Sequence, residues 1–582
     1  MKHPSSVGKL LCFAVTLLLH SCSQPRSESD FVRVRWARDP ERLDPLALGN
    51  PMAQEATYLL HLSLLQVDFS RHTHAPALVE SLPVVKFIGD SLTQLQYRLR
   101  PAAAWSNGRP VLTTDVAFTL KRLCCPGLPN EAARAQFGFI REIIPDPTNP
   151  RRFTLVCRGQ SVEYAPASGD FPILSEAALD PRGVLRRFSL AAMQQPTVPA
   201  TLDSARWVVA RQYRAANLAA LPGCGPYQLV KWERDRYLRF RRKPTWWADQ
   251  LQPVPLTLQA RPRELDFLII PDAATAALAL RRGDLDVYPQ IPAREFERLR
   301  ASPAARAGLR FYTTSSYDVL TAGFNTRRPA LADALTRQAL SRCFDAAGLL
   351  KATQLGGGQR SVGIISPTDN ANYNDSLPLL PFDPAGARGL LRRAGWQQSP
   401  GAQGHWFRRG PQGRQALQLG VRYRAEDDLF ATVALQFQAA AAGLGIPVTL
   451  QPTEAGAFSA AVNNGDFDVY VRVLKGNPFI FNFIPILHSL GVGEGNTTGF
   501  STPASDQLIE AIATAPTPAR RAQLLHRFQA LMQYEAPLVP LFFLPNRVVA
   551  DRRLSGLYAS SLRPGYSVTT LERSRAPQPP AK

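Results

Sequence analysis

Residues 95–122 of the chain read LQYRLRPAAAWSNGRPVLTTDVAFTLKR. Apolar and polar residues alternate through Leu99, which predicts a strand with one buried face. Asn107 and Gly108 are the residue types that a tight turn needs. The run that follows has Asp115 and the preceding Thr residues available as N-terminal caps, and its amphipathic pattern predicts a helix. A strand, a turn and a helix therefore follow one another closely.

The same two periodicities recur along the chain. Predicted strands cover residues 31–37, 228–232, 237–241, 265–270, 286–288, 417–421, 447–450 and 466–471. Predicted helices cover residues 53–65, 272–281 and 429–442, and the second is capped by Asp272 and ended by Gly283. Strands that alternate with helices at this spacing indicate βαβ units in mixed α/β lobes. Residues 123–222, which contain several prolines, are expected to be irregular.

Length and charge narrow the class of protein. A chain of 582 residues is too long for one compact core and indicates two to four structural units. Its 45% hydrophobic and 19% charged residues are typical of a globular protein. A net charge of +21 suits nucleic acid, an anionic membrane or an anionic ligand. The Arg residues are scattered without a basic run, so we expect no nucleic acid and interpret the charge as that of an Arg-rich proteome.

The N-terminus carries an export signal. Lys2 and Lys9 are its positive region, and residues 10–19 form an apolar stretch of signal length, too short for the roughly 20 residues that span a bilayer. The four residues Leu19-His20-Ser21-Cys22 resemble a bacterial lipobox. We therefore expect cleavage before Cys22 and lipidation of its thiol. A plain secretory signal with an incidental cysteine is the alternative.

Residues 22–30 are polar and suit a flexible tether between the lipid and the folded chain. No other stretch is long and apolar enough to predict a transmembrane helix. We therefore expect an exported protein on the periplasmic or cell-envelope face, attached to a membrane through its lipid anchor. Ser23 follows Cys22, which leaves the choice between the inner and the outer membrane open.

Cysteine usage is weakly informative. Removing the signal and the anchor leaves five cysteines, and an odd count excludes a complete set of intramolecular disulfides. One bridge from Cys124 or Cys125 to Cys157 is compatible with an oxidising compartment. No Cys-x-x-Cys pair or His cluster indicates a metal site, and we expect neither a metal nor a cofactor.

Seven segments, taken in order, resemble family 5 of the solute-binding proteins of bacterial ABC importers, the oligopeptide- and dipeptide-binding class. The most specific is the stretch quoted above, in which Asn107-Gly108 stands where the family usually has Asp-Gly. The others are Leu43-Asp44-Pro45, Gly223-Cys224-Gly225-Pro226-Tyr227, Gly283-Asp284-Leu285-Asp286, Phe324-Asn325-Thr326 with Arg337-Gln338-Ala339, Asp383-Pro384 with Leu390-Leu391 and Ala394-Gly395-Trp396, and Ala536-Pro537-Leu538-Val539-Pro540-Leu541. Each motif is weak alone, but their order over residues 40–560 is specific.

The resemblance implies an α/β fold of the periplasmic-binding-protein type (type II, cluster C), with two large lobes, a hinge and a smaller inserted lobe. On this basis the chain divides as follows: residues 1–21 signal, 22–30 tether, 31–75 with 205–305 and 535–572 lobe I, 76–204 lobe II, 306–534 lobe III, and 573–582 a disordered tail. Two crossovers between lobes I and III would form the hinge, and the ligand would lie in the cleft between them.

The resemblance also implies a function without a chemical step. The protein would be a monomer that captures a peptide or a related small polar solute and delivers it to a membrane permease, whose ATPase is a separate subunit. Ligand would favour the closed state by binding it more tightly than the open one. We find no Gly-x-Ser-x-Gly elbow and no His-Glu-x-x-His motif, so we expect no catalytic residue and no enzyme.

The resembled peptide binders use a carboxylate of lobe III to hold the amino terminus of the peptide. In this chain Asn477 takes that place, and an amide offers no ion pair to an ammonium. Lys475 and Arg472 lie in the same segment and favour an anionic group such as a carboxylate. The alternative is that both are solvated surface charges.

Three further candidates follow predicted strands. They are Tyr423 and Arg424 after one strand and Asn325 after another, because strand ends that face a cleft are where α/β lobes bind ligands. A structural role is the alternative for each. We interpret the family motif residues as turns, caps and packing; they are Trp105, Gly108, Asp115, Gly225 and Pro226.

Other functions are compatible with the same sequence. The cargo would then be an anionic opine-like compound, an oligosaccharide or other sugar derivative, a nickel chelate or an antimicrobial peptide; only eight His residues without a cluster disfavour nickel. A permease-independent sensor or chaperone-like binder is a different class. A hydrolase that uses the same cleft is a third.

Overall fold

The computed structural model describes residues 31–574 apart from residues 41, 47–50, 90, 129, 162, 196, 401–403, 411–412 and 494. The expected signal, Cys22, the tether and residues 575–582 lie outside the described residues. In the described ranges, no helix is both long and apolar enough to cross a membrane. Arg573 was expected in the tail but lies in a short strand, β23 (Glu572–Arg573), where its guanidinium is 2.6 Å from Asp286.

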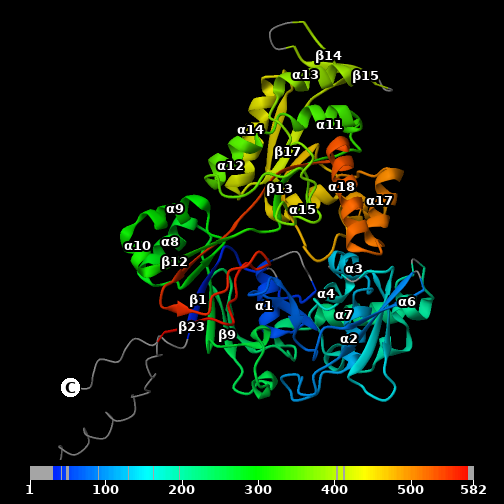
Figure 1. The fold of residues 1–582 in the computed structure, drawn as a ribbon, viewed down its shortest axis with the longest axis vertical. Coiled ribbons are helices and arrows are strands. Elements are labelled where there is room, and N and C mark those ends of the chain that lie inside the picture. The colour runs from blue at the N-terminus through cyan, green and yellow to red at the C-terminus, as the bar shows by residue number, and fades with distance from the viewer. Residues whose placement is uncertain are drawn as a thin grey trace, which may run out of the picture.

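Lobe I is built on a seven-stranded sheet in the order β12-β21-β11-β1-β10-β9-β8 (Figure 1). Its strands are β1 (Phe31–Trp36), β8 (Tyr227–Glu233), β9 (Tyr237–Arg242), β10 (Glu264–Ile269), β11 (Val287–Pro289), β12 (Leu309–Thr314) and β21 (Asn546–Asp551). Its main helices are α1 (Pro51–Leu60), α8 (Ala273–Arg282), α9 (Ala293–Ala301) and α10 (Pro303–Gly308). Strand β1 lies parallel to and between β10 and β11, which α8 connects, so the predicted βαβ unit is confirmed.

The predicted limits of α8 are confirmed. Asp272 accepts a hydrogen bond from the backbone N–H of Thr275 at 2.7 Å, as a capping residue does. Gly283 ends the helix with a φ of 76°, in the left-handed region that glycine adopts without steric cost.

Lobe II contains a four-stranded antiparallel sheet in the order β4-β5-β7-β6. Its strands are β4 (Val84–Ile88), β5 (Leu92–Arg98), β6 (Ile140–Pro145) and β7 (Arg152–Arg158). Its helices are α2 (Thr113–Arg122), α3 (Glu131–Phe137), α4 (Tyr164–Ala167), α5 (Glu176–Leu179), α6 (Leu190–Met193) and α7 (Ala200–Ala215). Beside this lobe, β2 (Leu65–Asp68) and β3 (Thr73–Pro76) form a two-stranded sheet.

The expectation that residues 123–222 are irregular was wrong. They contain β6, β7 and the 16-residue helix α7. In β7 the side chains of Phe153, Leu155 and Cys157 are buried while their neighbours are more exposed, which is the alternation of a half-buried strand. All five cysteines among the described residues are buried free thiols, so the suggested bridge to Cys157 is absent there.

Lobe III is built on a five-stranded sheet in the order β18-β17-β19-β13-β20. Its strands are β13 (Asp318–Phe324), β17 (Leu419–Arg424), β18 (Val448–Thr453), β19 (Val469–Lys475) and β20 (Leu538–Phe543). One face packs on α11 (Ala334–Ser341), α12 (Ala346–Gln354), α13 (Pro384–Arg393) and α14 (Asp428–Ala442), and the other on α15 (Ala455–Asn463), α17 (Pro503–Ala513) and α18 (Pro518–Glu535). A small sheet of β14 (Gln397–Gln398), β15 (Trp406–Gly410) and β16 (Gly413–Ala416) adjoins it.

Two short crossings join the sheets of lobes I and III. Residues 315–317 connect β12 to β13, and residues 544–545 connect β20 to β21. The crossings are bonded together, because the hydroxyl of Ser316 donates to the carbonyl of Leu544 at 2.5 Å. Strand pairing therefore places the two boundaries between lobes I and III at these crossings. The boundaries expected from the sequence were residues 306 and 535.

The stretch of residues 95–122 folds as strand, turn and helix, with one difference. Helix α2 begins after Leu112, and Asp115 acts from the third helical position instead of preceding the helix. Its carboxylate accepts hydrogen bonds from the N–H of Leu112 at 2.9 Å, from Nε1 of Trp105 at 3.3 Å and from the N–H of Glu176 at 2.9 Å. One buried carboxylate thus joins the turn, α2 and α5.

Substitution Asp115→Ala is expected to lower the free energy of unfolding by about 3 kcal/mol, because it leaves three buried donors without an acceptor. Urea denaturation followed by circular dichroism measures the change. Asp146→Ala is the matched control: Asp146 also accepts backbone hydrogen bonds, but in an exposed turn. Equal shifts of the two denaturation midpoints would contradict this account of Asp115.

Candidate ligand site at the lobe junction

The direction of the strands decides which residues lie at the junction of lobes I and III. In lobe III, β13 starts at the crossing, and its first residue, Asp318, pairs with Lys475 at the end of antiparallel β19. Strands β17 and β18 run parallel to β19, so Arg424 and Glu454 end up at the same edge. In lobe I, β1 runs in the same direction as β12, so Arg38 follows β1 at the edge nearest the crossings.

An ion pair joins the two lobes at this edge. Arg563 belongs to the C-terminal segment, which packs on lobe I, and its Nη2 lies 3.0 Å from Oδ1 of Asp318. The same guanidinium donates to the carbonyl of Gly476 at 3.4 Å. Arg563 therefore reaches across to the residue that follows Lys475.

Lys475 lies near three other cationic side chains and, among the described residues, has no partner of its own. Its side chain is exposed, and within the described ranges it has no hydrogen-bond or ion-pair partner. Enough protein nevertheless surrounds its ammonium to lower its pKa to about 8, mainly by desolvation. Arg563, Arg38 and Arg424 lower this pKa further, against the opposing effect of Asp318.

Asn477 is exposed close by, but its side-chain oxygen is already used. Oδ1 accepts a hydrogen bond from the backbone N–H of Phe479 at 2.9 Å, which closes a local turn. The ring of Phe479 in turn packs on His74, with 4.2 Å between the ring centroids. In this conformation Asn477 supports the loop rather than offering a free acceptor.

The structure brings some of the other candidates to the junction and leaves others away from it. Arg424 lies at the junction edge, where it pairs with Asp427 at 3.0 Å. Tyr423 is buried in the core under α14. Arg472 lies further inside β19, half-buried, with its guanidinium 4.7 Å from the ring centre of Tyr470.

Asn325 lies at the opposite edge of the lobe III sheet. It follows the far end of β13, because β13 runs away from the crossing. Its Nδ2 donates to the carbonyls of Gly465 and Phe467 at 3.0 and 3.1 Å, which is a structural role.

Several residues at the junction were missed by the sequence analysis. Asp170 lies 3.2 Å from Nε2 of His74 and accepts a hydrogen bond from the hydroxyl of Tyr58 at 3.3 Å. Arg38 follows a predicted strand, so the rule that selected Arg424 could also have selected Arg38. Arg563 and Asp170 carry no local signal, because only the folded chain brings them near Lys475 and His74.

Lobe II also contacts lobe III. Arg521 of α18 lies 2.6 Å from Glu163, and the hydroxyl of Tyr164 donates to the carbonyl of Ala513 at 3.3 Å. Burial raises the pKa of Glu163 to about 7, although Arg521 opposes the rise. The three lobes therefore meet around the junction residues.

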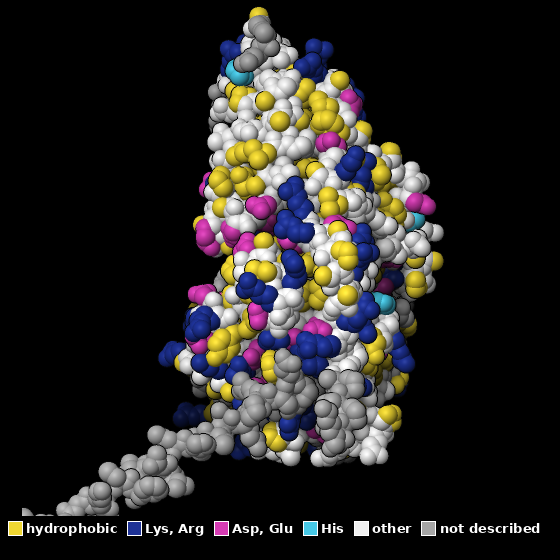
Figure 2. All heavy atoms as spheres, turned by 90° about the vertical axis from the view of Figure 1, so that its left-hand side faces the viewer, with side chains coloured by type: hydrophobic (Ala, Val, Ile, Leu, Met, Phe, Trp, Pro, Cys, Tyr) yellow, Lys and Arg dark blue, Asp and Glu magenta, His cyan; other side chains and the backbone are white. Residues whose placement is uncertain are grey.

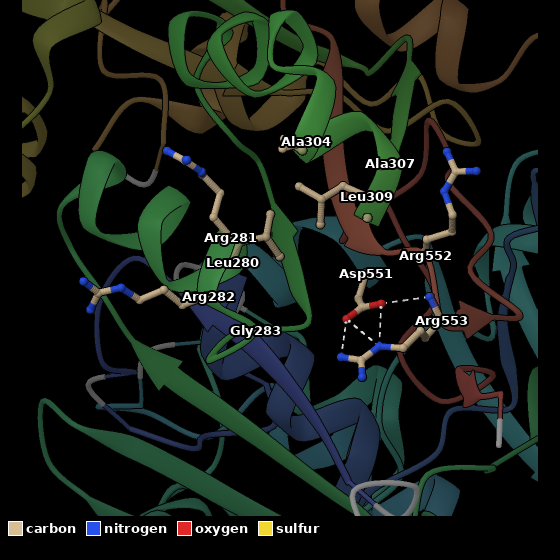
Figure 3. A pocket seen from close by; sticks show the side chains of 12 residues that line it. Leu280, Arg281, Arg282, Gly283, Ala304, Ala307, Leu309, Asp551, Arg552 and Arg553 are labelled. Carbon is tan, nitrogen blue, oxygen red and sulfur yellow. Dashed lines mark hydrogen bonds and ion pairs between the residues drawn. The ribbon is translucent and has the colours of Figure 1, made fainter. Parts of the chain in front are cut away.

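Two hollows lie away from the junction. One, of about 550 Å³, lies on lobe I between α8, α10 and the ends of β12 and β21. It is at the edge of the sheet opposite the crossings, and Asp551 in it accepts a hydrogen bond from Arg553 (Figure 3). The other, of about 330 Å³, lies in lobe III beside α18. On the face that carries α8 to α10, Lys and Arg side chains are mixed with acidic and apolar ones (Figure 2).

Comparison with known proteins decides the family. The model of bacterial extracellular solute-binding proteins, family 5 (middle), matches residues 74–481. The chain belongs to this family. Family 5 is a family of extracellular binding proteins, and the arrangement described above is that of one of its members.

Individual relatives differ in how much of their length is matched. Protein XP55 of Streptomyces lividans is 26% identical over 561 residues, which span 95% of this chain and 90% of that protein. A probable di/tripeptide-binding protein of Pseudomonas aeruginosa is 26% identical over 326 residues, 55% of this chain and 56% of that protein. Among solved structures, the oligopeptide-binding protein AppA of Bacillus subtilis, in complex with a nonapeptide, is similar with a TM-score of 0.75 at 16% identity, over 94% of this chain and 99% of that chain.

Lys475 is expected to react with acetic anhydride at pH 8 at least tenfold faster than Lys231. A pKa of about 8 leaves roughly half of the Lys475 amines neutral and nucleophilic at that pH. Lys231 is the control, since its hydrogen bonds to Tyr237 and Glu233 raise its pKa. Mass spectrometry of peptides after brief labelling measures both rates, and equal rates would show that the Lys475 ammonium is not perturbed.

Proposed function

We propose that this family 5 protein captures a peptide or a related small polar solute between lobes I and III and delivers it to the permease of an ABC importer. The observation that supports this best is the pair of short crossings, with polar side chains from both sheets at the edges beside them. Closure around such a hinge needs only a ligand that contacts both lobes. The protein would bind its ligand without altering it and would act as a monomer.

A non-peptide anionic solute is the second candidate. Asn477 stands where the resembled peptide binders have a carboxylate, and its Oδ1 is occupied by the N–H of Phe479. The cations at the junction favour an acidic group instead. A sensor or chaperone-like role without a permease stays compatible with the same fold.

The membrane attachment is proposed from the lipobox. Lipidation of Cys22 would hold the protein on the membrane at which the permease works. The mass of the N-terminal peptide of the mature protein tests this, because Cys22→Ser would abolish both the acyl mass and membrane fractionation.

Pooled di- and tripeptides are expected to raise the melting temperature of the purified protein. At a free concentration of 100 times Kd, a ligand adds about 2.7 kcal/mol to the free energy of unfolding. Scanning fluorimetry measures the shift, small-angle scattering should show a smaller radius of gyration when ligand closes the lobes, and native mass spectrometry should recover the ligand intact. Hydrolysed peptide in the recovered complex would contradict a pure binding role.

A further inference from the structure

Most acidic groups around the junction already have protein partners. Asp318 pairs with Arg563 at 3.0 Å and Asp427 with Arg424 at 3.0 Å, while Asp170 is bound by His74 and Tyr58. Three more acids are also engaged: Glu454 accepts from the backbone N–H groups of Gly456 and Ala457, Glu163 pairs with Arg521, and Asp369 accepts from the side chain of Asn372. A ligand ammonium that bound one of these carboxylates would have to displace its partner.

Two cations at the junction lack such partners. The side chains of Lys475 and Arg38 have neither a hydrogen bond nor an ion pair within the ranges that the structure describes. Arg38 follows β1 at the edge of the lobe I sheet nearest the crossings, and its charge acts on both Lys475 and Glu454 of lobe III. One unpartnered cation is therefore available from each side of the hinge.

We propose that the ligand carries an anionic group, such as a carboxylate, that binds between Lys475 of lobe III and Arg38 of lobe I, beside Arg563 and Arg424. This inference rests on the proposed binding function and specifies the chemical class of its ligand. Bound there, one anion contacts both lobes and lowers the repulsion among four cations. That repulsion opposes closure in the absence of ligand, so the anion selects the closed state. The amino terminus of a peptide is not required.

The pH dependence of binding follows from the same geometry. Lys475 is faced by Asp318 of β13, Arg563 of the C-terminal segment, Arg38 after β1 and Arg424 of β17. A bound anion favours the charged form of Lys475 and raises the pKa of this ammonium above about 8. Affinity is therefore highest while the ligand carboxylate and the Lys475 ammonium are both charged, and it falls as the pH rises through about 8, where binding takes up a proton. Calorimetry in two buffers of different ionisation enthalpy measures this uptake.

Three probes distinguish recognition of the amino terminus of a peptide from recognition of its carboxylate. They are trialanine, N-acetyl-trialanine and trialanine amide. Titration calorimetry with the full mature protein is expected to give N-acetyl-trialanine an affinity within a few-fold of trialanine, and trialanine amide an affinity at least tenfold weaker. Lys475→Gln and, separately, Arg38→Gln should each weaken the two free acids at least tenfold and leave the amide unchanged. Lys231→Gln is the matched control on β8, and it should change none of the three affinities.

Each outcome decides a different claim. If the amide binds as tightly as the free acids, or if Lys475→Gln weakens all three probes equally, the anion site is refuted while the binding function stands. If none of the three binds, peptide capture is refuted. A set of non-peptide carboxylates, including succinate and citrate, then decides the inference: binding that Lys475→Gln weakens tenfold supports it, and absence of binding overturns it.

Discussion

Two crossings, one of three residues and one of two, connect the sheets of the two large lobes. Because residues 315–317 and 544–545 are bonded to each other through Ser316 and Leu544, they act as one narrow connection. The direction in which each strand runs relative to this connection determines whether its first or its last residue lies beside the junction. The basic residues at these ends follow from that constraint, since β13 must run away from the crossing and its antiparallel neighbour β19 must run towards it.

The residues that mark the family hold this scaffold together and do not touch the junction. Asp115 joins a turn and two helices through three hydrogen bonds. Gly225 approaches the end of α1 so closely that a Cβ atom would lie 2.5 Å from the carbonyl oxygen of Leu59, and its N–H donates to the carbonyl of Leu60 at 2.9 Å. Motifs of this kind therefore report the fold, and they do not identify the ligand.

Acidic and basic side chains at the junction differ in whether they have protein partners. The carboxylates of Asp318, Asp427 and Asp170 have protein partners, whereas the side chains of Lys475 and Arg38 have none in the described part of the chain. Desolvation lowers the pKa of the Lys475 ammonium to about 8, Arg563, Arg38 and Arg424 lower it further, and a bound anion would favour its charged form. Such a site couples recognition of an anion to closure of the lobes, since the cations that contact it come from both of them.

Sequence alone determined the local elements and the family. Alternation, turn residues and caps are properties of neighbouring residues, so the βαβ units, the strands within residues 228–241 and the limits of α8 were predicted correctly. Lys475, Arg424 and Asn477 were named from the sequence as candidate ligand residues. Only the tertiary structure decided which strand ends share an edge. Asn325 follows a strand just as Arg424 does, yet the antiparallel course of β13 puts it on the far side, and Arg38 and Arg563 reach Lys475 only because distant segments pack together. Strand direction and long-range packing are set by contacts between remote residues, and no local pattern records them.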